Sequence, residues 1–156
     1  MFATATLGLS EIGFGTLFVV SAVGALVGSL TVSRVSERLG RRTTVLMSVT
    51  AIATSLLAIG LFPTVVVTAV GLLAVGLASE FRNVVAVSYR QNATPDRLRG
   101  RVMSAYRFIA YGSIPLGAQL GGWIASRFSI AAAFLFGGVL VAILTLFMVR
   151  NLGALK

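Results

Sequence analysis

The strongest constraint on this chain is an abrupt change of character within residues 24–42, where an apolar run ends in a basic loop. Within nine positions the loop carries four arginines, which are Arg34, Arg38, Arg41 and Arg42. Short loops rich in Arg and Lys are retained on the cytoplasmic side of a membrane. The junction therefore predicts a membrane-spanning helix that ends in a cytoplasmic loop.

Small residues recur at every fourth position along the apolar run. Gly24 and Gly28 form a GxxxG pair, and a second row beside it consists of Ser21, Ala25 and Ser29. Inside a bilayer, rows of small residues let another helix backbone approach closely, and packing replaces the hydrophobic effect as the source of association. The pattern predicts that one face of this helix packs tightly against a neighbouring helix.

Composition sets the class of protein. Hydrophobic residues make up 57% of the 156 residues and charged residues 11%, whereas soluble domains carry about 25% charged residues. We therefore expect an integral membrane protein that contacts the lipid bilayer. The formal charge of +9 does not indicate nucleic-acid binding, because a basic binding face requires a soluble body to carry it. Eleven of the thirteen basic residues instead fall in three segments, 34–42, 90–107 and 150–156.

Two missing residue types exclude much of the chemistry of enzymes. The chain contains no cysteine and no histidine, which excludes disulfides, thiolate zinc sites and imidazole proton relays. The sequence also offers no serine–histidine–acid set and no phosphate-binding loop. We expect no enzymatic activity, no metal and no cofactor.

Five apolar runs are long enough to cross a bilayer, whose core needs about 20 such residues per helix. They predict an all-α, polytopic membrane helix bundle over residues 12–149, with transmembrane helices at 12–33, 43–61, 64–93, 101–125 and 128–149. Residues 1–11 are expected to be an N-terminal remnant or outer loop. Residues 150–156 are expected to be a cytoplasmic tail, on the same side as the basic loops.

The string SRVSERLGRR at residues 33–42 resembles the loop motif of Major Facilitator Superfamily transporters, Gly-x-Leu-x-Asp-Arg-x-Gly-Arg-Arg. Two positions depart from that motif, since Ser33 replaces the glycine and Glu37 the aspartate. In the family, the acidic residue and the arginines form a charge network that stabilises one access state. The resemblance assigns this role to Glu37, Arg38, Arg41 and Arg42, with Gly40 shaping the turn. The alternative is a basic loop that only sets topology.

A second stretch extends the resemblance. TPDRLRGRV at residues 94–102, with PLGA at 115–118, resembles the tenth-to-eleventh helix region of the drug and macrolide efflux or enterobactin exporter-like branch. The candidate residues of this second cytoplasmic loop are Pro95, Asp96, Arg97, Arg99, Gly100 and Arg101. The resemblance implies that the five runs correspond to helices eight to twelve of a twelve-helix fold. It also implies a partner half containing helices one to seven, in the same longer chain or in a separate one.

Glu80 is an acidic residue deep within a predicted membrane span. Counted from Thr94 at about 1.5 Å per residue, it lies roughly 21 Å from the second basic loop. An ionisable residue at such depth is costly and by default indicates a functional site, which makes Glu80 a candidate for proton coupling. Two other interpretations stay open. One is a structural or substrate-orienting charge pair with Arg82 or Arg107, and the other is a position at the lipid interface.

Polar side chains on the third and fourth predicted helices are candidates for lining a substrate cavity. They are Arg82, Asn83, Arg107, Tyr111 and Gln119. Arg82 would suit an anionic substrate, whereas Arg107 would equally well extend towards the headgroups. Polar groups in membrane helices form interhelix hydrogen bonds at least as often as they contact substrate.

The resemblance implies a partial exporter of the superfamily. Its expected function is proton-coupled efflux of a small amphipathic drug or siderophore-like molecule by alternating access. The expected location is the bacterial plasma membrane, with the C-terminus in the cytoplasm. The alternative is a non-transporting membrane subunit, or an inactive truncated fragment, that associates through its small-residue helix faces.

Overall fold

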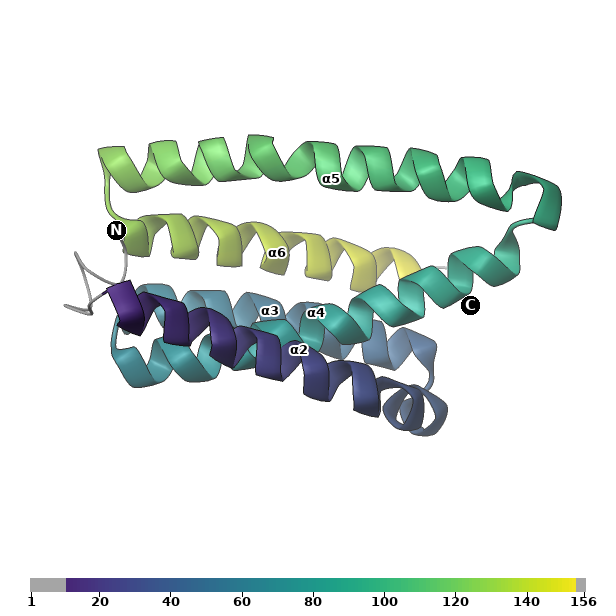
Figure 1. Ribbon diagram of the computed structural model, residues 1–156, viewed down its shortest axis with the longest axis horizontal. Coiled ribbons are helices and arrows are strands. Elements are labelled where there is room, and N and C mark those ends of the chain that lie inside the picture. The colour runs from purple at the N-terminus through teal and green to yellow at the C-terminus, as the bar shows by residue number, and fades with distance from the viewer. Residues whose placement is uncertain (1–10, 154–156) are drawn as a thin grey trace.

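The structure, a computed structural model, describes residues 11–153 as five consecutive helices joined by short turns (Figure 1). They are α2 (Glu11–Leu39), α3 (Arg41–Leu61), α4 (Val65–Ala93), α5 (Asp96–Arg127) and α6 (Ile130–Gly153). Each helix runs antiparallel to the one before it, so the chain passes back and forth along one axis. The predicted all-α bundle is confirmed. The predicted N-terminal segment and the end of the predicted tail lie outside the described residues.

Four of the described helices, α2, α3, α4 and α6, are long and apolar enough to cross a membrane. The remaining helix, α5, has 32 residues and is not among them; its charged side chains lie between Asp96 and Arg107 and at Arg127. Polar side chains on a helix at membrane depth face other protein or a water-filled cavity, not lipid. We therefore expect polar side chains near the middle of α5, such as Tyr111, to face such a neighbour.

Basic residues extend the helices instead of forming a long loop between them. α2 continues through Arg34 and Arg38, and α3 begins at Arg41, so the turn between the two helices is reduced to Gly40. Gly40 has a φ of 81°, a conformation that glycine adopts readily and L side chains rarely do. Its N–H donates a hydrogen bond to the Ser36 carbonyl at 3.0 Å. The arginines predicted in a loop thus lie on the adjoining ends of two helices.

Helices α2 and α4 cross at a contact made by glycines, which we call the α2–α4 crossing. A Cβ added at Gly24 of α2 would collide with the Leu73 carbonyl oxygen of α4. A Cβ added at Gly28 would lie 2.8 Å from another carbonyl oxygen of α4. The fit is reciprocal, because a Cβ added at Gly76 of α4 would collide with the Ser21 carbonyl oxygen of α2. The tight face predicted from the GxxxG pair is confirmed, and α4 is its partner.

Close packing at glycines also positions α3 between α4 and α6. A Cβ added at Gly60 of α3 would lie 2.6 Å from the Leu135 side chain of α6. On the opposite side, the fully buried side chain of Ile59 occupies the space beside Gly71 of α4. Small residues thus bring α2, α3, α4 and α6 close together without a large apolar core, as expected for helices that associate in lipid.

Helix α5 is packed far less closely than the others. Among its residues only Ile124 is buried, and its main neighbour is α6. Figure 1 shows α5 along one edge of the bundle, beside α6 and away from α2. Large side chains near its middle are open, with Phe108 82% exposed and Ile109 71% exposed. Most of the surface of α5 is therefore left uncovered within the described chain.

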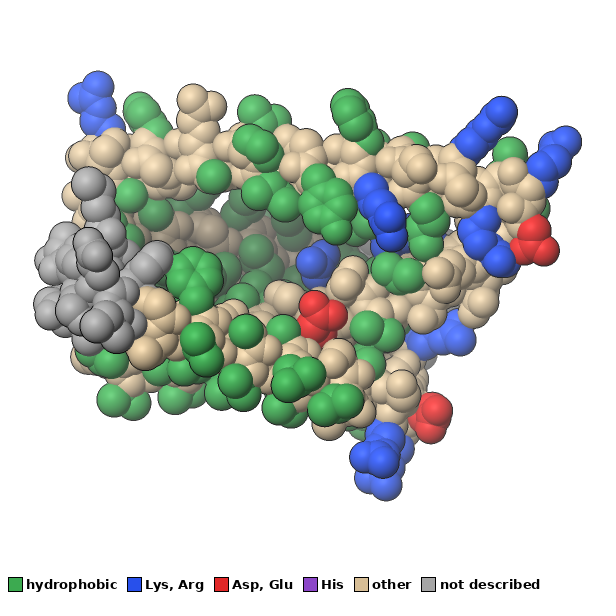
Figure 2. Space-filling view, viewed as in Figure 1, with side chains coloured by type: hydrophobic (Ala, Val, Ile, Leu, Met, Phe, Trp, Pro, Cys, Tyr) green, Lys and Arg blue, Asp and Glu red, His purple; other side chains and the backbone are tan. Residues whose placement is uncertain are grey.

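The arginines gather at one end of the bundle. Because alternate helices are antiparallel, that end collects the last turns of α2, α4 and α6 and the first turns of α3 and α5. Figure 2 shows most of the basic side chains there. Arg127, at the last turn of α5, lies at the opposite end. The alternation of basic and apolar segments in the sequence thus becomes a charge difference between the two ends of the molecule.

Candidate functional site

A cavity of about 250 Å³ lies between the C-terminal half of α4 and the N-terminal half of α5, and we call it the α4–α5 cavity. Figure 2 shows a hollow between α5 and the side of the bundle formed by α2 and α4. The cavity is lined by both polar and apolar side chains, which are Asn83, Val87, Arg90, Gln91, Met103, Tyr106, Arg107, Ala110 and Tyr111. Three of the residues predicted to line a substrate cavity thus meet here: Asn83, Arg107 and Tyr111.

The lining follows the helical repeat of both helices. On α4, positions 83, 87, 90 and 91 lie on one face, since residues three or four apart are neighbours on a helix. On α5, positions 103, 106, 107, 110 and 111 do the same. The connection between the two helices consists of Thr94 and Pro95 alone, so the two helices are joined closely at one end and separate along the bundle. The fold therefore brings side chains from two antiparallel helices into one site.

Arg90 is the most strongly constrained polar group in the α4–α5 cavity. Its guanidinium carbon lies 3.5 Å from the centroid of the Tyr106 ring, which is a cation–π contact between α4 and α5. Its Nε and Nη2 atoms are buried, and no described residue accepts a hydrogen bond from them. Sequence reasoning counted Arg90 only as part of a basic segment. The spacing of Asn83, Val87 and Arg90 on one helical face was the signal that could have identified it.

The start of α5 is fixed by residues of the second basic loop. Pro95 is the N-cap residue of α5, and Asp96 lies in the first helical turn, where its negative charge is favourable to the helix dipole. The Asp96 carboxylate and the Arg99 guanidinium form an ion pair of 2.7 Å on the exposed surface. The other residues of this loop motif, Arg97, Gly100 and Arg101, are also exposed on the first turns of α5. The predicted loop residues thus begin a helix.

Glu80 lies beside the α2–α4 crossing and outside the lining of the α4–α5 cavity. Its side chain is half-buried, and a Cβ added at Gly28 of α2 would lie 3.1 Å from the Glu80 Cβ. Among the described residues, neither Arg82 nor Arg107 forms an ion pair with it. The charge pair considered from the sequence is therefore not formed within this part of the chain.

Two of the predicted cavity residues lie elsewhere. Arg82 is exposed on α4, and Gln119 is exposed further along α5, two helical turns beyond Tyr111. Neither residue lines the α4–α5 cavity. The predicted residues lie on the two helices that line this cavity, but the sequence did not resolve which face or which depth of each helix forms it.

Comparison with known proteins assigns the family. The family model described as Major Facilitator Superfamily matches residues 1–153. The chain belongs to this superfamily. It is therefore a multi-pass membrane protein, and the resemblance seen in the two loop motifs is confirmed.

Among curated proteins, the chain is similar to the "Multidrug efflux pump Tap" of Mycolicibacterium fortuitum. The two are 28% identical over 121 residues, which is 78% of this chain and 30% of the relative. The chain thus matches less than a third of the length of that relative. No solved structure matches the chain.

The superfamily loop motif is divided between two helix ends. Glu37 and Arg38 lie on the last turn of α2, and Arg41 and Arg42 begin α3 across the turn at Gly40. In the described part of the chain, no ion pair joins Glu37 to an arginine of the motif. The charge network expected from the family is therefore not closed within these five helices.

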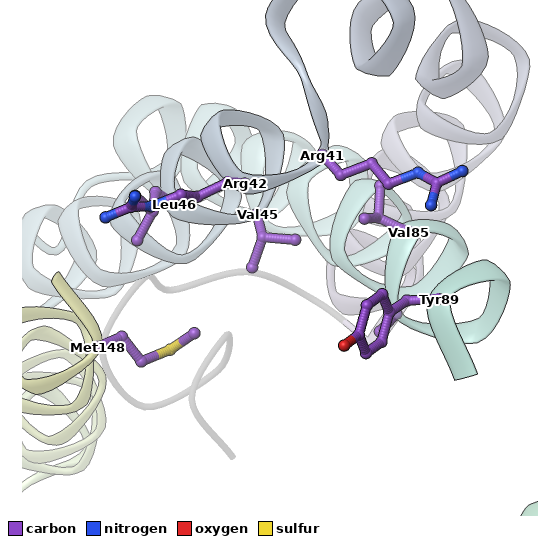
Figure 3. Close-up of a pocket in the computed structure, with 8 residues that line it drawn as sticks. Arg41, Arg42, Val45, Leu46, Val85, Tyr89 and Met148 are labelled. Carbon is purple, nitrogen blue, oxygen red and sulfur yellow. The ribbon is translucent and has the colours of Figure 1, made fainter. Parts of the chain in front are cut away.

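A larger cavity of about 460 Å³ lies where α3, α4 and α6 meet at the arginine-rich end (Figure 3). Its lining is mostly apolar and includes Val45, Val85 and Met148. Figure 3 shows the Arg41 and Arg42 side chains extending to opposite sides of it. Substrate sites combine an apolar wall with a few converging polar groups, and the α4–α5 cavity has this character although it is smaller.

Proposed function

We propose that this chain is the C-terminal part of a superfamily exporter that moves a small amphipathic molecule across the plasma membrane by alternating access. The observation that carries the proposal is the uncovered surface of α5, where the polar side chains of the α4–α5 cavity, such as Arg107 and Tyr111, have no further cover within the described chain. A polar helix face at membrane depth faces protein or water. The missing cover is a second half that contains helices one to seven, and the transport pathway runs between the two halves.

The size of the α4–α5 cavity supports this arrangement. Sites for drug-sized ligands span about 300–1,000 Å³. The α4–α5 cavity has about 250 Å³ and opens into the hollow beside α5. It therefore forms one wall of a larger site that the second half completes.

Orientation follows from the distribution of charge. The end of the bundle that gathers the arginines faces the cytoplasm, because Arg-rich segments next to membrane spans remain on that side. A cytoplasmic C-terminus is part of the same proposal, and it is supported by Arg150 in the last turn of α6 at this end of the bundle. The α4–α5 cavity lies nearer this end, where an exporter takes up its substrate.

Glu80 is the proposed proton-coupling residue. It is half-buried in an apolar span, and no described cation pairs with it. An ionisable side chain in such a place is costly and by default marks a functional site. Glu80 also sits beside the α2–α4 crossing, so a change in its charge acts directly on the contact between these two helices.

The test is efflux of a fluorescent amphipathic dye from proteoliposomes that contain this chain assembled with its N-terminal half. We expect efflux to require a pH gradient and to be lost in Glu80→Gln, which keeps the size of the side chain but takes up no proton. Asp96→Asn, which also removes one carboxylate but at an exposed helix start, is the matched control and should retain efflux. Equal efflux in Glu80→Gln and the unmodified protein would show that coupling does not use this residue.

The same assay separates the exporter from a non-transporting subunit. An assembled complex that forms but moves no dye under any gradient would contradict the exporter proposal. Dye movement that continues without a pH gradient would leave transport in place and remove the proton from the mechanism.

A further inference from the structure

We propose that the α4–α5 cavity binds the negatively charged group of an amphipathic organic anion, with Arg90 as its principal contact. This inference rests on the proposed function, because it names the chemical class of the transported molecule. The charged group is a carboxylate, sulfonate or phosphate. The apolar part of the molecule extends from the cavity into the hollow beside α5.

The hydrogen-bonding state of Arg90 is the first argument. A guanidinium remains protonated in proteins, so Arg90 carries its charge into the cavity. The two atoms that lack an acceptor among the described residues, Nε and Nη2, belong to the same edge of the guanidinium. Their N–H bonds are parallel, which is the arrangement that binds both oxygens of a carboxylate or phosphate. A buried donor left without an acceptor is costly, so this edge favours an anion over a neutral or cationic group.

Stacking on Tyr106 explains why that edge is free. The ring lies 3.5 Å from the guanidinium carbon and covers one face of the plane. Cation–π contact holds the guanidinium without using its N–H groups, which lie in the plane. Tyr106 therefore fixes the orientation of Arg90 without using the hydrogen-bonding capacity of its Nε and Nη2 atoms.

The other residues that line the α4–α5 cavity also favour an anion. Arg107 adds a second positive charge, and none of the lining residues is Asp or Glu. The described carboxylates are engaged or lie elsewhere, since Asp96 pairs with Arg99 and Glu80 lies outside the lining. Apolar side chains such as Val87 and Met103 stand beside the charged groups. A site with two cations, no counter-charge of its own and an apolar wall suits an amphipathic anion.

Binding of two dyes with one aromatic frame and opposite charge tests the inference. The chain is placed in nanodiscs of phosphatidylcholine, and fluorescence anisotropy reports the affinity for carboxyfluorescein, an anion, and for rhodamine 6G, a cation. We expect the anion to bind more tightly. Loss of hydrogen bonds to a charged group weakens binding about tenfold or more, so Arg90→Gln should lower anion affinity by at least that factor. Arg90→Lys, which keeps the charge but loses the two-donor edge, should give an intermediate value.

Arg97→Gln is the matched control, because it removes the same charge from an exposed position on the first turn of α5. It should change anion affinity little. The inference is overturned if rhodamine 6G binds as tightly as carboxyfluorescein, or if the Arg97 and Arg90 variants lose anion affinity equally. Helical circular dichroism equal to that of the unmodified chain verifies that each variant is folded.

Two further outcomes are distinguishable. If nanodiscs containing phosphatidylglycerol abolish binding of carboxyfluorescein, the occupant is a lipid headgroup and the substrate assignment is wrong. The binding assay needs no transport, so anion binding without efflux under any gradient would contradict the exporter proposal alone. Efflux restricted to cations would contradict the present inference and leave the exporter in place.

Discussion

The two ends of α4 serve different purposes. Its N-terminal half forms the α2–α4 crossing, where glycines on both helices bring backbone against backbone. Its C-terminal half faces α5 across a cavity whose polar groups are incompletely hydrogen-bonded. The first region has no room for another atom, whereas the second has room and unsatisfied donors. One helix thus provides close backbone packing at one end and hydrogen-bond donors without partners beside a cavity at the other.

This difference separates residues that hold the fold from residues that act on a ligand. A glycine at the α2–α4 crossing is required because any side chain would displace a neighbouring backbone. A glycine on α5, such as Gly117, has open space around it within the described chain. Adding a side chain at a crossing glycine should therefore lower the free energy of unfolding, whereas adding one at an open glycine of α5 should not. Substitutions in the α4–α5 cavity should instead change ligand affinity.

The largest effect on stability is expected from Gly24→Ala at the crossing. The new Cβ would collide with the Leu73 carbonyl oxygen, which belongs to a helix backbone and is not free to move aside. Overpacking of this kind costs about 1–3 kcal/mol. Unfolding of the chain in mixed micelles, followed by circular dichroism, measures the change.

Gly117→Ala is the control for that measurement. No atom lies within 4 Å of the added Cβ, and alanine is favoured over glycine in a helix by up to about 1 kcal/mol. The free energy of unfolding should stay constant or rise. A loss as large as that of Gly24→Ala would mean that the two regions do not differ in packing.

The smallest effect is expected from Asp96→Asn at the beginning of α5. The ion pair with Arg99 is exposed, with its two side chains 88% and 47% exposed, and surface ion pairs contribute at most about 1 kcal/mol. A change in the free energy of unfolding below about 1 kcal/mol would mean that this ion pair contributes little to holding α5 in place. A larger loss would show that this end of α5 is held by its own charges.

The α2–α4 crossing, where backbones pack together, was predicted from sequence better than the α4–α5 cavity, which depends on side-chain positions. The spacing of Gly24 and Gly28 was sufficient to predict a close helix contact, because four-residue spacing alone places both on one face. It did not identify α4 as the partner, since any helix with a complementary small residue would fit. The apolar runs predicted every described helix, but the basic residues were assigned to loops although they continue the helices.

The candidate site was predicted only in part. Asn83, Arg107 and Tyr111 were selected as polar residues on the correct helices, and the structure brings them together. Arg90 was missed because its importance depends on Tyr106, which lies on another helix and whose ring direction no sequence pattern reveals. Conversely, Glu80 and Arg107 were considered as a charge pair, but no ion pair joins them in the described chain, and only Arg107 lines the α4–α5 cavity. The depth of a residue along a helix can be estimated from sequence, whereas the sides on which two helices face each other cannot.

The central claim is that the polar face of α5 lines an aqueous pathway and is not exposed to lipid. The chain contains no cysteine, so a single introduced thiol reports its own surroundings. Tyr111→Cys on α5 and Phe147→Cys on α6 replace side chains that are 67% and 65% exposed in this structure.

The measurement is the rate of labelling by a membrane-impermeant maleimide in inside-out membrane vesicles that contain the chain with its N-terminal half. We expect rapid labelling of Tyr111→Cys and negligible labelling of Phe147→Cys. Equally slow labelling at both positions would place this part of α5 in lipid and exclude an aqueous pathway beside it.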